Sequence, residues 1–401
     1  MNVEKIRQDF DVLKKGIIYF DNACMTLRPN QVIEEISRYY KEFPSCSGRS
    51  NHQLAIKATE EFENARDKIG HFLNAKAADE IILTKNTTEA INIVANSFPF
   101  EQGKVTMSSD REHNSNLIPW QFLEKKKGIK HIIVESDANE EFSLQNFENA
   151  LQKNKTQIVA IQYASNIDGY ILPIEKIIKL AHDFNALVLV DAAQGAPHSK
   201  IDVRKLDIDF LAFSGHKACG PSGTGCLYGK KELLEKMGPF MVGGHTVYNS
   251  TYTNAEFENA PAKFEAGLQD VAGMIGFGKA CEYLEKIGLQ NIEEYERKLN
   301  KIITERLTAI EGLEIIGVKD WKKKSGITSF NVNGMDIFDI AILLDNTKKI
   351  AIRAGMHCAH SWFNKRNLKG SARASLYFYN TEEEARIFCE ELQDIVKTLG
   401  K

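Results

Sequence analysis

Apolar and polar positions follow two different rhythms along the first 285 residues. One stretch repeats apolar residues at steps of three and four, as one face of an amphipathic helix does, at Leu54, Ala58, Phe62, Ala65, Ile69 and Phe72. Short continuous apolar runs, typical of buried strands, span 81–84, 105–108, 157–162, 186–190 and 211–214, and a helical stretch spans 174–184. Strand–helix–strand alternation predicts an α/β fold whose mainly parallel sheet is covered on both faces and binds ligands at its carboxyl strand ends.

The pattern changes after about residue 285. It indicates a charged helix at 292–307, short strands at 314–318 and 326–332, and a C-terminal helix that Thr381 opens with Glu384 three residues on. These elements predict a smaller α+β domain. We therefore expect a large domain over residues 21–285 and a small domain formed by residues 1–20 and 286–401.

Composition argues against a nucleic acid or a membrane as the main partner. The 401 residues include 51 Lys and Arg against 54 Asp and Glu, a formal net charge of -3. The apolar runs are far shorter than the ~20 residues that span a bilayer, and the first ten residues are too polar for a signal peptide. The seven cysteines contain no CxxC pair, which argues against a disulfide framework and a structural metal site. We expect a reducing, cytoplasmic location.

Two charged residues follow buried apolar runs. Lys217 comes after the run that ends at Ser214, and one interpretation is a Schiff-base lysine whose amine attacks an aldehyde cofactor. The alternative is a turn lysine exposed to water. Asp191 directly follows Val188-Leu-Val, where a carboxylate suits the protonated nitrogen of a pyridine ring; the alternative is an N-cap. The two residues together are far more specific than either alone.

Two further stretches suit a phosphorylated, flat cofactor. Thr87 and Thr88 follow Asn86, which caps a predicted helix, and N–H groups and hydroxyls at a helix start bind phosphate. His113 follows a predicted strand, where its ring is a candidate for stacking on a flat cofactor and for catalytic proton transfer. Threonine is also a common cap, and a lone histidine is more often structural.

A cysteine and an arginine near the C-terminus are candidates for substrate chemistry. Cys358 stands between His357 and His360 in a Gly-containing loop, and a neighbouring imidazolium or a helix end lowers the pKa of a thiol. The alternative is an inert, buried cysteine. Arg373 offers a planar fork for a substrate carboxylate, with a structural ion pair as the alternative.

A series of short motifs extends along nearly the whole chain. They are Tyr19-Phe-Asp-Asn-Ala23, Asn86-Thr-Thr-Glu-Ala90, Glu112-His113 with Pro119-Trp120, Ser165-Asn166, Asp191-Ala-Ala-Gln194, Ser214-Gly-His-Lys217, Phe264-Glu-Ala-Gly267, Arg353-Ala-Gly-Met-His-Cys358, Arg373-Ala-Ser-Leu376 and Tyr379-Asn-Thr381. In this order they resemble the class V pyridoxal-5′-phosphate (PLP) enzymes, and within them the SufS-like (type II) cysteine desulfurases and selenocysteine lyases. The resemblance implies the PLP-dependent transferase fold of type I, with a mainly parallel sheet of the seven-stranded type.

The resemblance also implies residue roles. Lys217 carries PLP, Asp191 pairs with the pyridine nitrogen, and His113 stacks on the ring. The ring oxygen binds Asn166 and Gln194; the phosphate binds Thr88, Ser214 and His216, with Thr87 nearby; the substrate contacts Arg373 and Asn166. Cys358 aligns with the cysteine that takes sulfur from L-cysteine as a persulfide and leaves L-alanine. The family implies a homodimer and a sulfur-acceptor protein, serving iron–sulfur cluster assembly, tRNA thiolation or a cofactor pathway.

The chain departs from the family pattern at several positions. Gly48-Arg49 stands where the family has His-Arg, although His52 is close, and Leu268 stands where a threonine usually reaches the neighbouring subunit's phosphate. Cys24 replaces a small residue near the cofactor, and Cys46 and Cys219 are further thiols for which we expect packing roles.

Other functions remain open on the sequence. The same scaffold supports a selenocysteine lyase, an aminotransferase, an epimerase or a kynureninase-like enzyme, and only the Cys358 loop favours desulfuration. A non-catalytic sulfur-carrier or scaffold protein is the alternative from another class, which intact Lys217 and Asp191 disfavour. The glycines at 220–225 do not have the spacing and strand–helix context of a P-loop or Rossmann motif.

Overall fold

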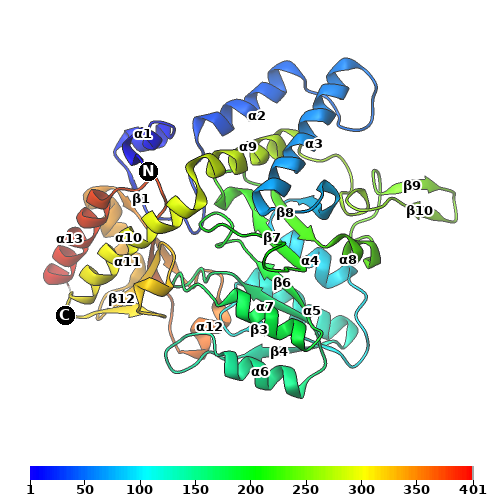
Figure 1. Ribbon diagram of the computed structural model, residues 1–401. Coiled ribbons are helices and arrows are strands. Elements are labelled where there is room, and N and C mark those ends of the chain that lie inside the picture. Colours follow the sequence, from blue (N-terminus) through cyan, green and yellow to red (C-terminus); the bar gives the residue numbers. More distant parts are fainter. Residues whose placement is uncertain (400–401) are drawn as a thin grey trace.

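A seven-stranded sheet forms the centre of the molecule (Figure 1). The computed structural model describes residues 1–399. The strands lie in the order β2 (Ile81–Thr84), β8 (Gly225–Gly229), β7 (Phe210–Ser214), β6 (Leu187–Asp191), β5 (Thr156–Gln162), β3 (Val105–Ser109) and β4 (Lys130–Val134). The β8 strand is antiparallel to both neighbours, and the pairs from β7 to β4 are parallel. The predicted mainly parallel sheet is confirmed.

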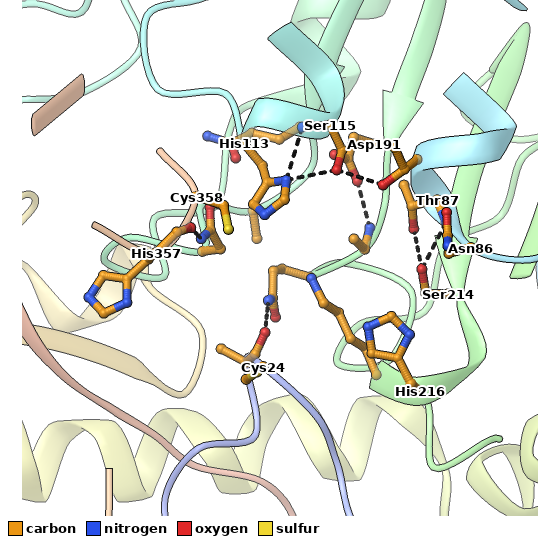
Figure 2. Close-up of a pocket in the computed structure, with 18 of the residues that line it drawn as sticks. Cys24, Asn86, Thr87, His113, Ser115, Asp191, Ser214, His216, His357 and Cys358 are labelled. Carbon is orange, nitrogen blue, oxygen red and sulfur yellow. Dashed lines mark hydrogen bonds between the residues drawn. The ribbon is translucent and has the colours of Figure 1, made fainter. Parts of the chain in front are cut away.

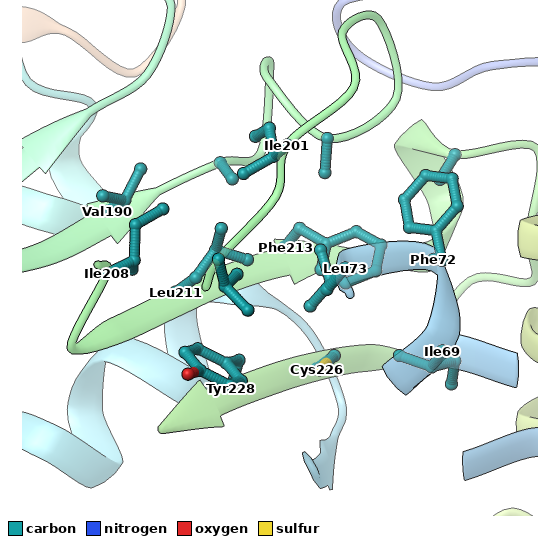
Figure 3. Close-up of a cluster of buried hydrophobic side chains, with 14 of the residues drawn as sticks. Ile69, Phe72, Leu73, Val190, Ile201, Ile208, Leu211, Phe213, Cys226 and Tyr228 are labelled. Carbon is teal, nitrogen blue, oxygen red and sulfur yellow. The ribbon is translucent and has the colours of Figure 1, made fainter. Parts of the chain in front are cut away.

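Helices cover both faces of this sheet. One face packs against α3 (Gln53–Leu73), α6 (Leu144–Lys153), α7 (Ile174–Asp183) and α9 (Val271–Ile287), with α2 (Asn30–Glu42) on α9. The other packs against α4 (Thr87–Ser97), α5 (Asn114–Lys127) and α8 (Lys231–Lys236). Figure 3 shows the first face, where Phe72 of α3 stacks on Phe213 of β7. Because both faces are buried, the central strands read as continuous apolar runs.

The C-terminal part of the chain, residues 286–399, builds a second sheet. Its four antiparallel strands lie in the order β11 (Leu313–Ile316), β12 (Ile327–Val332), β15 (Ser371–Ser375) and β14 (Arg353–Gly355). Its helices are α10 (Leu289–Thr308), α11 (Ile337–Lys348), α12 (His360–Lys365) and α13 (Glu382–Leu399). The helices and antiparallel strands are of the α+β type that the sequence predicted here.

The N-terminal segment contacts both parts. Ile18 and Phe20 belong to the hydrophobic cluster of the C-terminal part, whereas Phe10 and Leu13 pack in the core of the large sheet. The domain boundaries at 21–285 stay a prediction. The remaining helices and strands are α1 (Val3–Arg7), β1 (Ile18–Tyr19), which pairs with β13 (Ile350–Ala351), and the hairpin β9 (Val247–Ser250) and β10 (Ala255–Phe257).

Most predicted elements are found within a few residues of their expected bounds. Asn86 caps α4 by accepting a hydrogen bond from the backbone of Glu89 (3.0 Å), and Thr381 and Glu384 cap α13 reciprocally (3.0 Å each). The strand expected at 314–318 ends at Ile316, because Gly317 turns the chain with φ of +80°. Within residues 1–399, no helix is long and apolar enough to cross a membrane.

Candidate active site

A cavity of about 220 Å³ lies at the carboxyl ends of β5, β6 and β7 (Figure 2). Every predicted site residue lines it: Thr87, Thr88, His113, Asn166, Asp191, Gln194, Ser214, His216, Lys217, Cys358 and Arg373. These residues are spread over nearly three hundred positions of the sequence. The fold therefore brings the whole predicted set to one place.

The lysine and the carboxylate occupy the ends of neighbouring strands. Lys217 lies in the 3-10 helix Gly215–Lys217 after β7, and Asp191 is the last residue of β6. Burial lowers the pKa of Lys217, although attraction to Asp191 opposes this shift, and burial raises the pKa of Asp191. Asp191 accepts a hydrogen bond from the backbone of Ala193 (3.0 Å), and no described helix starts there, which excludes the N-cap alternative. Lys217 is half-buried and lines the cavity, which excludes an exposed turn lysine.

The N-terminus of α4 forms one end of the cavity. The backbone N and the Oγ1 of Thr87 lie 2.8 and 2.7 Å from Ser214 Oγ, and Thr88 Oγ1 lies 2.7 Å from Ser115 Oγ. Burial lowers the pKa of His216 to about 4, with Lys217 adding to the shift. Hydroxyl groups and a helix N-terminus at one place are suited to a phosphate group.

His113 presents a neutral imidazole to the cavity. Its Nδ1 accepts a hydrogen bond from the backbone N–H of Ser115 (3.1 Å), so Nε2 carries the ring hydrogen. Burial, followed by the charge of Lys217, lowers its pKa to about 3. The adjacent Glu112 is buried, which raises its pKa to about 8. A flat, uncharged ring at this position is suited to stacking on an aromatic cofactor.

Two buried amide oxygens in the cavity lining have no hydrogen-bond partner among the described residues. They are Oδ1 of Asn166 and Oε1 of Gln194. The amide nitrogens of the same side chains donate to the carbonyl oxygens of His357 and Ala23, each at 2.7 Å. Buried polar atoms are normally paired, so these two oxygens favour a ligand with a hydroxyl donor in the cavity.

Arg373 combines a structural ion pair with an unused donor. It is 1% exposed, and burial lowers its pKa to about 10. It donates through Nη1 to the carbonyl oxygen of Asn166 (2.9 Å) and through Nη2 to Asp21 Oδ1 (3.3 Å). Its Nε has no partner within residues 1–399. The ion-pair alternative from the sequence is therefore present, and a donor remains for a substrate carboxylate.

The loop between β14 and α12 holds Cys358 at the cavity by backbone contacts. His357 and Cys358 both have left-handed backbones, with φ of +49° and +56°. The carbonyl oxygen of Cys358 accepts from the backbone of Asn114 (2.7 Å), and that of His357 accepts from Asn166. Burial lowers the pKa of His357 to about 2, so this neighbour does not supply the imidazolium that the sequence suggested. Cys358 is half-buried, which excludes a fully buried, inert thiol.

Three polar cavity residues received no role from the sequence: Ser115, Gln162 and Arg353. Ser115 follows His113, and Arg353 opens the motif that ends in Cys358, so proximity to a candidate was the available signal. Gln162 is the last residue of β5, and its only signal was a position at a strand end.

The departures from the family pattern have local partners. Arg49 donates to the carbonyl oxygen of Gly267 (2.5 Å). His52 caps α3 by accepting from the backbone of Ala55 (3.3 Å), and it is not part of the cavity lining. Leu268 is 61% exposed.

The extra cysteines differ in position. Cys24 lines the cavity, and Arg353 Nη1 lies 2.9 Å from its Sγ. Cys219 is fully buried, and burial raises its pKa to about 12; Cys46 is half-buried and outside the cavity. Within the described chain all cysteines are free, and no group of three His, Cys, Asp or Glu side chains is placed to hold a metal ion.

A lysine and a carboxylate at adjoining strand ends of a mainly parallel, seven-stranded sheet define the PLP-dependent transferases of fold type I, the predicted fold class. The Aminotransferase class-V family model matches residues 18–388. The chain belongs to this family, as its motifs predicted.

Similar proteins share the full length of the chain. A probable cysteine desulfurase of Synechocystis sp. is 39% identical, over 98% of this chain and 95% of its own. The apo structure of the cysteine desulfurase from Thermococcus onnurineus NA1 is 37% identical, with a TM-score of 0.94 over 99% of this chain and 98% of that one. The cysteine desulfurase CsdA from Escherichia coli, in an S-sulfonic acid form, is 32% identical, with a TM-score of 0.92 over 100% and 99%.

Proposed function

We propose that this protein is a PLP-dependent cysteine desulfurase that converts L-cysteine to L-alanine and holds the sulfur as a persulfide on Cys358. The observation that carries the proposal is that Cys358 lines the same cavity as Lys217 and Asp191. Full-length similarity to proteins named cysteine desulfurase supports it.

The residues of the cavity fit PLP. Thr87, Thr88, Ser214 and His216 would hold the phosphate at the start of α4, and Asp191 would hold the pyridine nitrogen. The unpartnered oxygens of Asn166 and Gln194 would accept from the ring hydroxyl, and His113 would cover one ring face. When bound, PLP supplies an electron sink for negative charge that develops at the substrate Cα.

Lys217 would hold the cofactor and would move the substrate proton. Because burial lowers its pKa, the amine reaches its neutral form more readily than an exposed lysine, and the neutral amine is the nucleophile and the base. Arg373 orients the substrate by its carboxylate, with the unpartnered Nε as one donor.

Cys358 accepts the sulfur. Its thiolate Sγ attacks the substrate sulfur, an S–S bond forms, and the Cβ–S bond breaks with its electron pair left on the carbon chain. Protonation of that chain gives alanine, and the enzyme keeps Cys358–S–SH. The backbone hydrogen bonds of the loop limit the movement of Cys358 relative to Asn114 and Asn166.

The test is alanine and sulfide production from L-cysteine with a reductant. The PLP-loaded wild type should form both products, and Cys358→Ala should keep the cofactor absorbance and lose sulfide release. Full activity of Cys358→Ala would remove Cys358 as the nucleophile. An inactive, PLP-loaded wild type would contradict the desulfurase reaction.

The proposal includes a homodimer, an acceptor protein and a cytoplasmic location. The hairpin β9–β10 carries exposed aromatic side chains, with Tyr248 at 76% and Phe257 at 42%, which supports a protein contact at this hairpin. The Cys358 persulfide passes its outer sulfur to a thiol of the acceptor, and the free cysteines support reducing surroundings. Light scattering after size-exclusion chromatography tests the dimer: a monomer mass would exclude it.

A further inference from the structure

The loop between β4 and α6 carries carboxylates that pair with cations of the C-terminal part. The pairs are Glu135–Lys365 (2.7 Å), Glu140–Arg366 (2.5 Å) and Glu141–Lys323 (2.6 Å). Two of these cations flank the end of α12, which lies beside β4 and α6 in Figure 1 and begins two residues after Cys358. The loop between β4 and α6 therefore binds α12, the helix that follows the Cys358 loop.

The Glu140–Arg366 pair is the strongest of the three by geometry. The guanidinium binds both carboxylate oxygens, with Nε 3.0 Å from Oε1 and Nη2 2.5 Å from Oε2. It also lies over the ring of Trp362 in α12, at 4.1 Å from the centroid. The side chains of Arg366 and Glu140 are 19% and 34% exposed, whereas those of Lys365 and Glu135 are 50% and 66% exposed. An exposed lysine pair of that kind contributes little.

The backbone of Glu140 is fixed on its other side. Its φ is +62°, and the carboxylate of Asp137 holds the turn by accepting from the backbones of Asn139 (2.8 Å) and Glu141 (3.0 Å). The carbonyl oxygen of Glu140 accepts from Arg111 Nη2. Glu140 is therefore bound through its carboxylate to α12 and through its carbonyl to Arg111.

Arg111 connects this turn to two cavity segments. It is fully buried and precedes His113 by two residues, and its Nη1 lies 3.1 Å from Asp168 Oδ2. Asp168, also fully buried, follows Asn166 by two residues. The segments that present His113, Asn166 and Cys358 to the cavity thus meet through Glu140 and Arg111.

We propose that Glu140 is a positioning residue that holds α12, and with it the Cys358 loop, closed against the cofactor side of the cavity. The proposal rests on the proposed desulfurase function for its kinetic consequence. Loss of the Glu140–Arg366 pair leaves the binding groups for PLP and the substrate carboxylate unchanged, because none of them contacts Glu140. This loss affects the step in which Cys358 reaches the substrate sulfur.

The experiment compares Glu140→Gln with Glu135→Gln in the PLP-loaded protein. Each variant removes one negative charge from the same loop, but only the first breaks the bidentate pair. We expect Glu140→Gln to lower kcat for alanine formation about tenfold, with KM for L-cysteine changed by less than about twofold. The rate at which a bulky maleimide labels Cys358, followed by mass spectrometry of its peptide, should rise about tenfold. Glu135→Gln should match the wild type in each measurement.

Equal labelling rates and equal kcat values for the two variants would overturn the proposal. So would a lower unfolding temperature of Glu140→Gln with no change in labelling or in the ratio of kcat to KM, because that result describes a purely structural pair. If Glu140→Gln fails to fold, Arg366→Lys takes its place, because it keeps the charge and removes the bidentate fork. Its kcat and the labelling rate of Cys358 are then compared with those of Glu135→Gln in the same way. The labelling does not require turnover, so an inactive wild type would contradict the desulfurase function while the labelling still decided the role of Glu140.

Discussion

Replacing Glu265 by glutamine should remove the counterion of Arg66 inside the core of the large sheet. The two side chains are 1% and 3% exposed and make a bidentate pair with distances of 2.6 and 3.0 Å. The same carboxylate accepts from the backbone of Leu83 in β2 (2.8 Å), and Arg66 donates to the carbonyl oxygen of Ile81 (2.8 Å). The pair therefore joins α3 to the edge strand that leads into α4.

The magnitude follows from burial. Removing one charge of a buried pair costs about 3–5 kcal/mol, because the other ion stays desolvated without its counterion. Arg66 has a second carboxylate, Glu63, at 2.9 Å, but that side chain is 52% exposed, and exposed pairs contribute about 0–1 kcal/mol. We expect the free energy of unfolding to fall by about 3–5 kcal/mol in Glu265→Gln and by at most about 1 kcal/mol in Glu63→Gln.

Urea unfolding followed by far-UV circular dichroism measures both variants against the wild type. The PLP concentration is held fixed, because a ligand that binds the folded state adds to the apparent stability. Equal losses of unfolding free energy in the two variants, or a loss below about 1 kcal/mol in Glu265→Gln, would refute the reasoning that burial makes removal of one charge from this pair costly.

Three further outcomes are expected. Lys217→Ala should abolish turnover and lose its visible absorbance once free PLP is removed, since no covalent link remains; absorbance that survives gel filtration would contradict this role. Gly225→Ala should weaken binding of inorganic phosphate and PLP in equilibrium dialysis, because a Cβ there would lie 2.6 Å from Asn86 Cα at the start of α4; unchanged affinity would contradict it. His182 has a raised pKa, mainly through its hydrogen bond to Asp209 (2.8 Å), so this pair stabilises fully below about pH 6.5 and less as pH rises through the folded-state pKa. The unfolding temperature of His182→Gln should therefore be lower than that of the wild type at pH 6 and should approach it at higher pH. A difference that grows with pH would contradict this prediction.

Local sequence patterns determined the central elements. The run that became β6 is apolar at every position because both faces of the sheet are covered, and its final aspartate stands where parallel strands present ligand-binding groups. The N-caps of α4 and α13 depend on residues three positions apart, so the sequence alone predicted them. The β8 strand was not among the predicted runs, and its direction could not be read from the sequence either, because an apolar run has the same pattern in a parallel and an antiparallel strand.

By itself, then, the sequence determined the α/β class, five of the seven strands of the large sheet and most of the polar residues that line the cavity, through periodicity, caps and motifs that act over a few positions. The tertiary structure alone decided which groups meet. Arg353 reaches Cys24 across 329 positions, and Arg366 reaches Glu140 across 226. The neutral state of His357 likewise follows from burial by distant segments. Contacts and desolvation of this kind depend on the path of the whole chain, and no local pattern specifies them.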